Sequence, residues 1–486
     1  MANTKTDLRP DTGSAVPRHR MLIDGVWREG GRERDVINPY NGEIVARAPE
    51  STLQDLDDAL RAATAARPRA AAMPGYQRAA LLRKVGQLLL ERVDEIATVM
   101  SREIGKAIKD ARTEVARSQD TIMLAAEEAI RIEGEQVPLD GSAMGAGKVA
   151  FMLRFPVGVV AGITPFNAPF NLACHKVAPA IAAGNTIVLK APPQAPGTVT
   201  MLCELFADAG APAGLVNLLH GNTVGPALVR DPRVDFITFT GSSHVGLDIK
   251  AASGTRRVAL ELGGNGVTIV HADADLAEAA PTCARNAMRL AGQSCISVQN
   301  VYVHETLYEP FVEQLVEHVR QLRLGDPLDP ATDVGTLIDE AAARRVERWV
   351  AEAVSGGARV LTGGQRHGAQ YEPTVLVDVD PSMKVVCEEI FGPVVTVQRY
   401  RELAPVLAAV SADQYGLQCG IFTQSLPVAF EAIRNLRVGG VIVNGSSTWR
   451  TDQLAYGGVK ASGTGREGPR YAIRDMTEER LVVFNL

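Results

Sequence analysis

The chain has 486 residues, of which 46% are hydrophobic and 22% charged. This length and composition are typical of a globular protein with about three domains. The formal net charge is −6 and no long run of Lys or Arg occurs, which argues against a nucleic-acid partner. No stretch of about 18 apolar residues is present, so we expect no membrane-spanning helix and no membrane partner.

The six cysteines fall singly, without a CxxC pair or the spacing of a disulfide framework. This pattern is typical of a reducing compartment and favours the cytoplasm. The first residues are polar and lack the apolar centre of a secretory signal, so we interpret residues 1–18 as a flexible tail. The sequence contains no HExxH motif or carboxylate cluster, and no metal site is predicted.

The first predicted elements are a hairpin that turns at Asp24-Gly25 and a helical region over residues 51–132. Short apolar strands then alternate with helical stretches, a rhythm that predicts βαβ units and a parallel, doubly wound sheet. The predicted strands are 158–163, 186–191, 214–219, 235–240 and 257–262, and the predicted helices are 171–183, 198–209, 224–229 and 245–252.

A second alternating series runs from about residue 263 to 444, with strands near 301–304, 394–398, 419–423 and 439–444. The simplest fold class is therefore α/β with two doubly wound domains in tandem. The segment ERLVVF near the C-terminus predicts a strand with no sequential partner. Because an isolated strand must pair with something, we expect it to pair with a neighbouring subunit.

Four segments have the residue types that chemistry needs. In FTGSSHVG, Gly241 and Gly246 frame a strand–helix turn whose amides suit a phosphate, although many such turns need glycine for their backbone alone. Glu261 lies between leucines in a buried strand, where burial raises a carboxyl pKa toward that of a general base. The alternative is a structural ion pair.

Cys295 follows a helix and has the small polar neighbours of an accessible thiol, whereas most single cysteines are inert core residues. Asn167 lies in a loop between Pro165 and Pro169. Its amide either caps a turn or presents a rigid N–H to an oxyanion.

Taken in order, these segments resemble the aldehyde dehydrogenase superfamily from about Met21 onward. The interval from Glu261 to Cys295 also resembles that of the family. The matching motifs are PFNAP with Asn167, IVLKA with Lys190, FTGSSHVG, LELGG with Glu261, GQSC with Cys295, EEIFGPV and YGGVKASGTGREG.

The resemblance implies a variant Rossmann cofactor domain, formed by residues 19–132 and 152–262. It also implies a catalytic domain over residues 263–465 and a small β oligomerisation extension, residues 133–151 and 466–486. In such proteins the arm near 133–151 pairs with the C-terminal strand of another subunit. A homodimer or homotetramer is therefore expected.

The resemblance further implies that Cys295 is the nucleophile, Glu261 activates water and Asn167 stabilises the oxyanion. Lys190 would bind the adenosine ribose, and Glu389 with Phe391 the nicotinamide ribose. The expected contacts of NAD or NADP are Thr164, Pro165, Phe166, Lys190, Gly241, Ser242, Val245, Leu262, Gly263, Glu389 and Phe391.

Two competing functions remain open. A CoA-acylating dehydrogenase would pass the thioester to a thiol, but relatives of that kind lack the glutamate at position 261. A non-catalytic protein with this fold would be favoured by loss of Cys295 or Asn167, and both are present. Pro193 stands where many NAD-preferring relatives carry an acid that repels a 2′-phosphate. Its absence removes that repulsion without creating a phosphate pocket, so NAD, NADP or use of both stays open.

The stretch STWRTDQLAYGGVK resembles the branch that oxidises small anionic aldehydes, such as phosphonoacetaldehyde, phosphonoformaldehyde, sulfolactaldehyde and lactaldehyde dehydrogenases. Trp449 and Arg450 match that branch, and Arg112 is expected as a second anion-binding arginine. The alternative is that both arginines form surface ion pairs. Ala168 and Ser294 replace a His and an Arg that some members of the branch carry.

Overall fold

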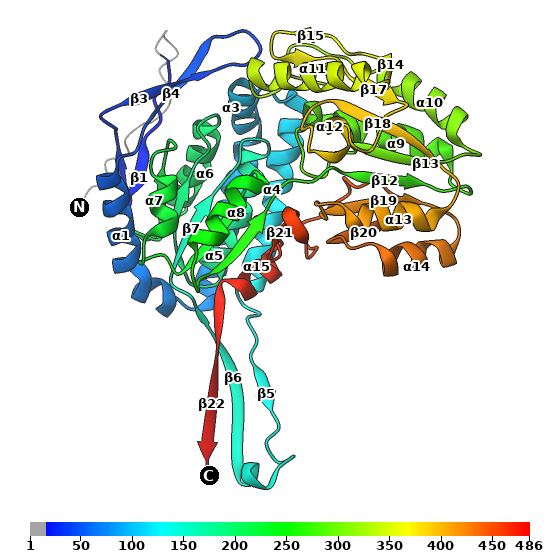
Figure 1. Ribbon diagram of the computed structural model, residues 1–486. Helices are drawn as coiled ribbons and strands as arrows, with labels where there is room; N and C mark the ends of the chain where they lie inside the picture. The colour runs from blue at the N-terminus through cyan, green and yellow to red at the C-terminus, as the bar shows by residue number, and fades with distance from the viewer. Residues whose placement is uncertain (1–15) are drawn as a thin grey trace.

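The computed structural model describes residues 16–486, so most of the predicted flexible tail, residues 1–18, lies outside the described residues. Arg18 already forms a bridge with Arg47. Figure 1 shows two α/β lobes side by side and a long β arm that projects from the first lobe. The two predicted α/β units in tandem are therefore confirmed.

The first lobe is built on an eight-stranded sheet in the order β2-β1-β9-β8-β7-β10-β11-β21. Its five central strands, β9 to β11 in that order, are parallel, and the hairpin β1–β2 and short β21 extend the edges in antiparallel fashion. The bounds are β1 Met21–Ile23, β2 Val26–Arg28, β7 Val159–Ile163, β8 Thr186–Lys190, β9 Val216–Leu219, β10 Phe236–Thr240, β11 Arg257–Glu261 and β21 Gly463–Thr464.

Both faces of this sheet are covered because its strands are apolar on both sides. Ile187 and Leu189 of β8 join the core beneath one layer of helices, whereas Val188 joins the core on the other face. The first layer comprises α2 (Gly75–Glu91), α3 (Val93–Ile104), α4 (Ile108–Glu128), α5 (Pro169–Ala182) and α6 (Pro196–Asp208); the second comprises α1 (Leu53–Ala72), α7 (Gly225–Arg230) and α8 (Ser243–Ala252).

The second lobe contains a seven-stranded sheet in the order β14-β17-β18-β13-β12-β19-β20. All its pairs except β14–β17 are parallel. Its strands are β12 Val267–Val270, β13 Asn300–His304, β14 Arg359–Thr362, β17 Thr374–Val377, β18 Val394–Tyr400, β19 Gln418–Phe422 and β20 Gly440–Val443; its main helices are α9 Leu276–Met288, α10 Tyr308–Arg320, α11 Glu340–Ser355, α13 Leu403–Ala412 and α14 Leu426–Asn435.

The β arm differs from the expectation that the C-terminal strand finds its partner in a neighbouring subunit. β22 (Thr477–Asn485), which contains the ERLVVF segment, pairs with β6 (Lys148–Pro156) of the same chain in nine antiparallel pairs. β5 (Glu135–Val137) adds a third strand, and Figure 1 shows the three strands leaving the body together. The C-terminal strand thus has a partner within its own chain. The helix that precedes β22, α15 (Pro469–Asp475), packs against α5 and α4.

The topology places the loops that follow β7, β8, β10 and β11 at one edge of the first sheet. In doubly wound sheets ligands bind outside the carboxyl ends of parallel strands, so this edge is where a site is expected. The second lobe faces it through the loops around residues 289–299 and 444–468. Within residues 16–486, no helix is both long and apolar enough to cross a membrane.

Candidate active site

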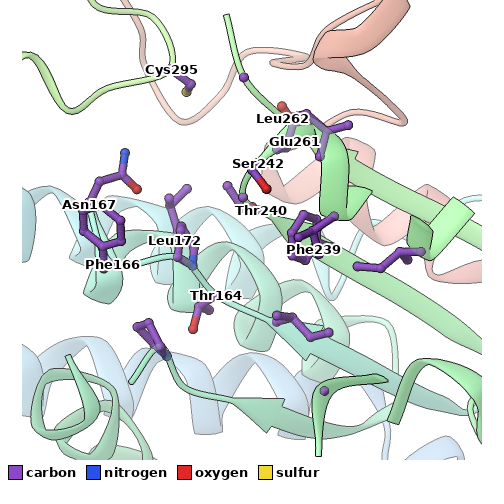
Figure 2. Close-up of a pocket in the computed structure, with 18 of the residues that line it drawn as sticks. Thr164, Phe166, Asn167, Leu172, Phe239, Thr240, Ser242, Glu261, Leu262 and Cys295 are labelled. Atoms are coloured by element: carbon purple, nitrogen blue, oxygen red, sulfur yellow. The ribbon is translucent and has the colours of Figure 1, made fainter. Parts of the chain in front are cut away.

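A cavity of about 820 Å³ lies at this edge, lined by residues of both lobes. Figure 2 shows Cys295 on one side of it, with Asn167 and Glu261 approaching from different elements. All three predicted catalytic residues line it. So do the predicted cofactor residues Thr164, Pro165, Phe166, Lys190, Gly241, Ser242, Val245, Leu262, Gly263, Glu389 and Phe391.

The loop that carries Cys295 has an unusual backbone. Leu290, Ala291 and Gly292 adopt φ values of 58°, 52° and 71°, three consecutive residues in the left-handed region. A Cβ at Gly292 would collide with the carbonyl of Gly392, so this position requires glycine. Non-glycine residues in this conformation persist only where their surroundings fix them, which is common at functional sites.

The side chain of Gln293 fixes the same loop from within. Its amide Nε2 donates to the carbonyl of Thr336 at 3.2 Å, and its Oε1 accepts from the backbone N–H of Ile338 at 2.8 Å. Its backbone carbonyl accepts a hydrogen bond from Asn167 Nδ2 at 3.0 Å. An amide nitrogen carries two hydrogens, so Asn167 keeps one donor for the cavity.

Asn167 is held in turn by the helix that follows it. The buried carboxylate of Glu114, on α4, accepts from the backbone N–H groups of Phe170 at 3.0 Å and Asn171 at 3.1 Å. The buried Lys106 ammonium pairs with the same carboxylate. Glu114 therefore caps the first turn of α5, directly after the Asn167 loop, and its charge is compensated by Lys106.

Glu261 ends strand β11 with both carboxylate oxygens buried and without a hydrogen-bond partner. Burial, reinforced by the negative charge of Glu467, raises its pKa well above the usual range. A Cβ at Gly457 would come within 2.8 Å of Glu261 Oε1, so the glycine there lets the backbone pass close to the carboxylate. An unpaired carboxylate facing a cavity fits a proton acceptor better than a structural ion pair.

A second buried carboxylate, Glu467, was missed in the sequence analysis although it lies in the YGGVKASGTGREG motif. Its Oε1 accepts from Arg450 Nη2 at 2.6 Å, and its Oε2 lies 4.0 Å from Lys176 Nζ. Burial opposes ionisation, but His175, Arg450 and Lys176 outweigh it and lower the pKa of Glu467 to about 2. Glu467 therefore keeps its negative charge more firmly than Glu261, whose pKa is shifted in the opposite direction.

Arg450 lines the cavity, as predicted for an anion-binding residue. Its side chain is only 9% exposed and Nε is buried without a hydrogen-bond partner. Its guanidinium carbon lies 3.9 Å from the centre of the Tyr456 ring. The neighbouring Trp449 does not reach the cavity lining: it is 53% exposed, and its carbonyl accepts from Gln418.

Arg112 does not line the cavity, so the prediction that it is a second anion-binding arginine is wrong. It is 47% exposed and donates from Nε to Asp94 Oδ1 at 2.7 Å, as a surface ion pair. Arg117, further along the same helix, does not line the cavity either, but it is linked to Arg450 through Asp452 and His175. It binds Asp452 through Nε at 2.9 Å and Nη2 at 2.6 Å, and Asp452 contacts His175 at 2.9 Å.

The far end of the cavity has the features of a dinucleotide site. Ser242 is the N-cap residue directly before α8 and forms no side-chain cap, so the helix N-terminus keeps donors for a phosphate. Burial lowers the pKa of Lys190 to about 8, although Glu50 opposes this shift, and Lys190 Nζ lies 3.4 Å from Asn222 Oδ1. Pro193 lines the wall near Lys190 and offers no carboxylate against a 2′-phosphate.

Glu389 also lines the cavity, and its charge contributes to the raised pKa of the Cys295 thiol. Burial raises the pKa of Glu389 to about 7, against hydrogen bonding from Gly264 N–H at 3.2 Å and the charge of Arg345. Arg345 also lines the cavity and donates from Nη2 to the carbonyl of Ile390 at 2.6 Å. Sequence reasoning missed Arg345, which lies in an ordinary amphipathic helix. Among the described residues, no three His, Cys, Asp or Glu side chains gather in a metal-binding arrangement.

Comparison with known proteins agrees with this geometry. The aldehyde dehydrogenase family model matches residues 27–482. The chain is 44% identical to 3-sulfolactaldehyde dehydrogenase of Priestia aryabhattai, over 97% of this chain and 99% of that protein. It superposes with a TM-score of 0.95 and 41% identity on aldehyde dehydrogenase 21 of Physcomitrella patens in complex with succinate, covering 97% and 99% of the two chains.

A third similar structure is an NADP-dependent glyceraldehyde-3-phosphate dehydrogenase of Bacillus halodurans complexed with NADP. Its TM-score is 0.94 at 35% identity, over 96% of this chain and 99% of that one. The chain belongs to the aldehyde dehydrogenase family. Its activity is the NAD(P)-dependent oxidation of an aldehyde to an acid.

Proposed function

We propose that the substrate is a short aldehyde with a sulfonate or carboxylate at its far end, and that Cys295, Glu261 and Asn167 carry out its oxidation. The observation that supports this most directly is Arg450. It lines the same cavity as Cys295, it is buried, and its Nε has no protein partner. A buried guanidinium N–H without an acceptor favours a ligand that supplies an anionic oxygen.

The charges around Arg450 support the same substrate class. Arg450, Lys176 and Arg117 are cations, whereas Glu467 and Asp452 are the carboxylates that pair with them. These three cations and two carboxylates leave one positive charge in excess, and burial raises the pKa of Glu261, so that carboxyl offsets the charge less readily than an ordinary glutamate would. A buried group with an uncompensated cation is expected to prefer a ligand that carries the missing anion.

Acylation begins with the Cys295 thiolate. Its sulfur forms a bond with the aldehyde carbon while the carbonyl electron pair moves to oxygen, which gives a thiohemiacetal oxyanion. In the proposed mechanism, the free N–H of Asn167 and the backbone N–H of Cys295 stabilise that charge. Collapse of the oxyanion restores the C=O bond, releases hydride from carbon and leaves a thioester on Cys295.

NAD(P)⁺, when bound, supplies the acceptor for this hydride. The residues that would hold it are Lys190 at the adenosine ribose, the α8 N-terminus at the pyrophosphate, and Glu389 with Phe391 at the nicotinamide ribose. The cavity lining supports this assignment because these residues and Cys295 all line the same cavity.

Glu261 acts in the second half of the reaction. In its deprotonated form it takes a proton from water, whose oxygen bonds to the thioester carbon, and the C–S bond then breaks to release the acid and the Cys295 thiolate. A raised pKa makes Glu261 a stronger base once it is ionised. A carboxylate that activates water favours hydrolysis over transfer of the acyl group to CoA.

Both anions, sulfonate and carboxylate, have support among similar proteins. The similarity to the 3-sulfolactaldehyde dehydrogenase supports a sulfonate, and the similarity to the succinate-bound structure supports a carboxylate. We expect a sulfonated three-carbon aldehyde to be preferred over an uncharged aldehyde of equal length. Steady-state rates with sulfonated, carboxylated and neutral aldehydes, each with NAD⁺ and NADP⁺, test this order.

Arg450→Ala and Arg112→Ala form a matched pair for the test, since both remove an arginine that pairs with an acid. Loss of a charge-assisted hydrogen bond costs about 1.5–3 kcal/mol. Arg450→Ala should therefore lower kcat/KM for an anionic aldehyde by about ten- to a hundred-fold more than for the neutral one. Arg112→Ala should change neither. Equal losses on both substrates in Arg450→Ala would contradict the anionic-substrate proposal.

We also propose that the chain forms a homodimer or homotetramer. β22 is an edge strand of the arm, and its Leu481, Val483 and Phe484 side chains are 58%, 43% and 51% exposed. A long apolar edge strand favours pairing with a second copy. Light scattering of the wild type and of Leu481→Lys tests this, and a monomeric wild type would contradict it.

The six free cysteines support a reducing location such as the cytoplasm.

A further inference from the structure

The hydroxyl of Tyr456 contacts the sulfur of the nucleophile. Its Oη lies 3.1 Å from Cys295 Sγ, and both side chains line the active-site cavity. Tyr456 comes from the segment after β20, whereas Cys295 comes from the loop after α9. The contact is therefore made across the site, and it joins two segments that the chain keeps 161 positions apart.

In the reactive state the hydrogen bond must run from the tyrosine to the sulfur. Burial raises the pKa of the Tyr456 phenol well above its usual range, so the phenol keeps its proton. A thiolate has no proton and only accepts. The same burial raises the pKa of the Cys295 thiol to about 12, and the contact with Tyr456 opposes that shift.

Arg450 and Glu467 hold the tyrosine in place. The Arg450 guanidinium lies over the Tyr456 ring at 3.9 Å, a cation–π contact that withdraws negative charge from the ring. The backbone of Tyr456 is paired with that of Glu467 in both directions: Tyr456 N–H donates to the Glu467 carbonyl at 3.0 Å, and Glu467 N–H donates to the Tyr456 carbonyl at 2.6 Å. The hydroxyl is thus preorganised before substrate arrives.

We propose that Tyr456 is a catalytic residue whose hydroxyl donates a hydrogen bond to the Cys295 thiolate. The bond stabilises the thiolate before attack. It weakens when sulfur bonds to the substrate carbon, and it forms again when the thioester breaks and the thiolate leaves. No proton is transferred to or from Tyr456 at any step. This role rests on the proposed assignment of Cys295 as nucleophile.

Tyr456→Phe removes only the hydroxyl and tests the role directly. The full-length enzyme, with and without NAD⁺, is treated with iodoacetamide over a range of pH, and alkylation of the Cys295 peptide is followed by mass spectrometry. Loss of one hydrogen bond to a charged group is expected to raise the pH midpoint of alkylation by about one unit. The less stabilised thiolate should also react faster once it is fully formed.

Tyr371→Phe is the matched control. Tyr371 is likewise buried, and its hydroxyl contacts only the carbonyl of Gly364, at 3.3 Å, in the core of the second lobe. Its loss should leave the midpoint unchanged. Placing 3-fluorotyrosine at position 456 provides a test that preserves packing: a more acidic phenol is a stronger donor and should lower the midpoint.

An unchanged midpoint in Tyr456→Phe, or a shift equal to that of the control, overturns the proposal. If Tyr456→Phe does not fold, a midpoint that fails to fall with 3-fluorotyrosine overturns it instead. Failure of the nucleophile assignment is distinguishable, because it would give dehydrogenase turnover in Cys295→Ala. The alkylation midpoint of Cys295 can be measured whether or not that cysteine attacks the substrate.

Discussion

Asn167 donates a hydrogen bond from its side-chain amide to the backbone carbonyl of Gln293, two residues before Cys295, at 3.0 Å. The bond joins the loop after β7 in the first lobe to the loop of the second lobe that carries Cys295. Gln293 is also fixed to Ile338 by its own side chain. The proposed oxyanion donor and the proposed nucleophile are therefore held in one rigid arrangement across the boundary between the lobes.

Asn167→Ala should lower kcat by about 10²- to 10³-fold, because one oxyanion donor contributes about 3–4 kcal/mol to stabilisation of the transition state. KM should change little, since the donor acts on charge that forms after binding. Steady-state kinetics measure both constants. A large rise in KM at normal kcat would instead assign Asn167 to substrate binding.

Cys295→Ala should abolish turnover while nucleotide binding and the circular dichroism spectrum remain those of the wild type. Cys387→Ala is the control, because Cys387 is the other cysteine that is not fully buried and it contacts only the carbonyl of Ser382. It should retain wild-type activity, since it does not line the cavity. Activity in Cys295→Ala together with loss in Cys387→Ala would reverse the assignment.

Glu261→Gln should preserve acylation and slow hydrolysis of the thioester. Rapid mixing with NAD⁺ and substrate is then expected to give a burst of NADH of about one equivalent per site, followed by a slow steady rate. The acyl group should be found on the Cys295 peptide by mass spectrometry. Wild-type turnover without a trapped acyl-enzyme would remove Glu261 from the mechanism.

Glu467→Gln should change the pH dependence of deacylation in a defined direction. Glu467 adds a negative charge that raises the pKa of Glu261, and its loss also leaves Arg450 unpaired beside the base. Both changes favour ionised Glu261, so the pH below which deacylation falls should move to lower values. Single-turnover rates as a function of pH measure the shift, and movement to higher pH would contradict the proposed coupling.

Pro193→Glu should shift the nucleotide preference toward NAD⁺. The wall beside Lys190 has no carboxylate at this position, and a new one would repel a 2′-phosphate. We expect the ratio of kcat/KM for NADP⁺ to that for NAD⁺ to fall by about tenfold or more, an effect of about 1.4 kcal/mol. Pro193→Gln is the uncharged control and should leave the ratio nearly unchanged.

Much of the site could be predicted because its residues lie at strand ends and in turns, within motifs that follow one another in the same order as in the family. Asn167, Glu261 and Cys295 each follow a recognisable apolar element, and all three line one cavity. The prediction that Arg112 binds the substrate anion was wrong for a geometric reason. It and Arg117 share one helix but lie five positions apart, on different faces, and only the structure shows that Arg117 is the one facing Asp452.

The sequence could not predict which of the buried charged residues contact one another. Glu467, Lys176 and His175 come from segments almost 300 positions apart, so their contacts depend on how α5 packs against the last loops of the chain. The pairing of β22 with β6 of the same chain was missed for a related reason. An alternating apolar strand predicts that a partner exists, but the pattern does not say whether that partner is in the same chain.

The arm has a consequence for how the chain tolerates change. Pairing β22 with β6 closes a loop from Pro156 to Thr477 that contains the entire second lobe. Contacts between such distant positions form slowly, because the chain between them must first be brought together. The entropy of closing a loop grows only logarithmically, by about 0.6 kcal/mol for each doubling in length. Insertions in the surface loops of the second lobe should therefore leave the arm almost as stable as before. A new proline in β22 at a position whose N–H donates to β6 should instead open the arm.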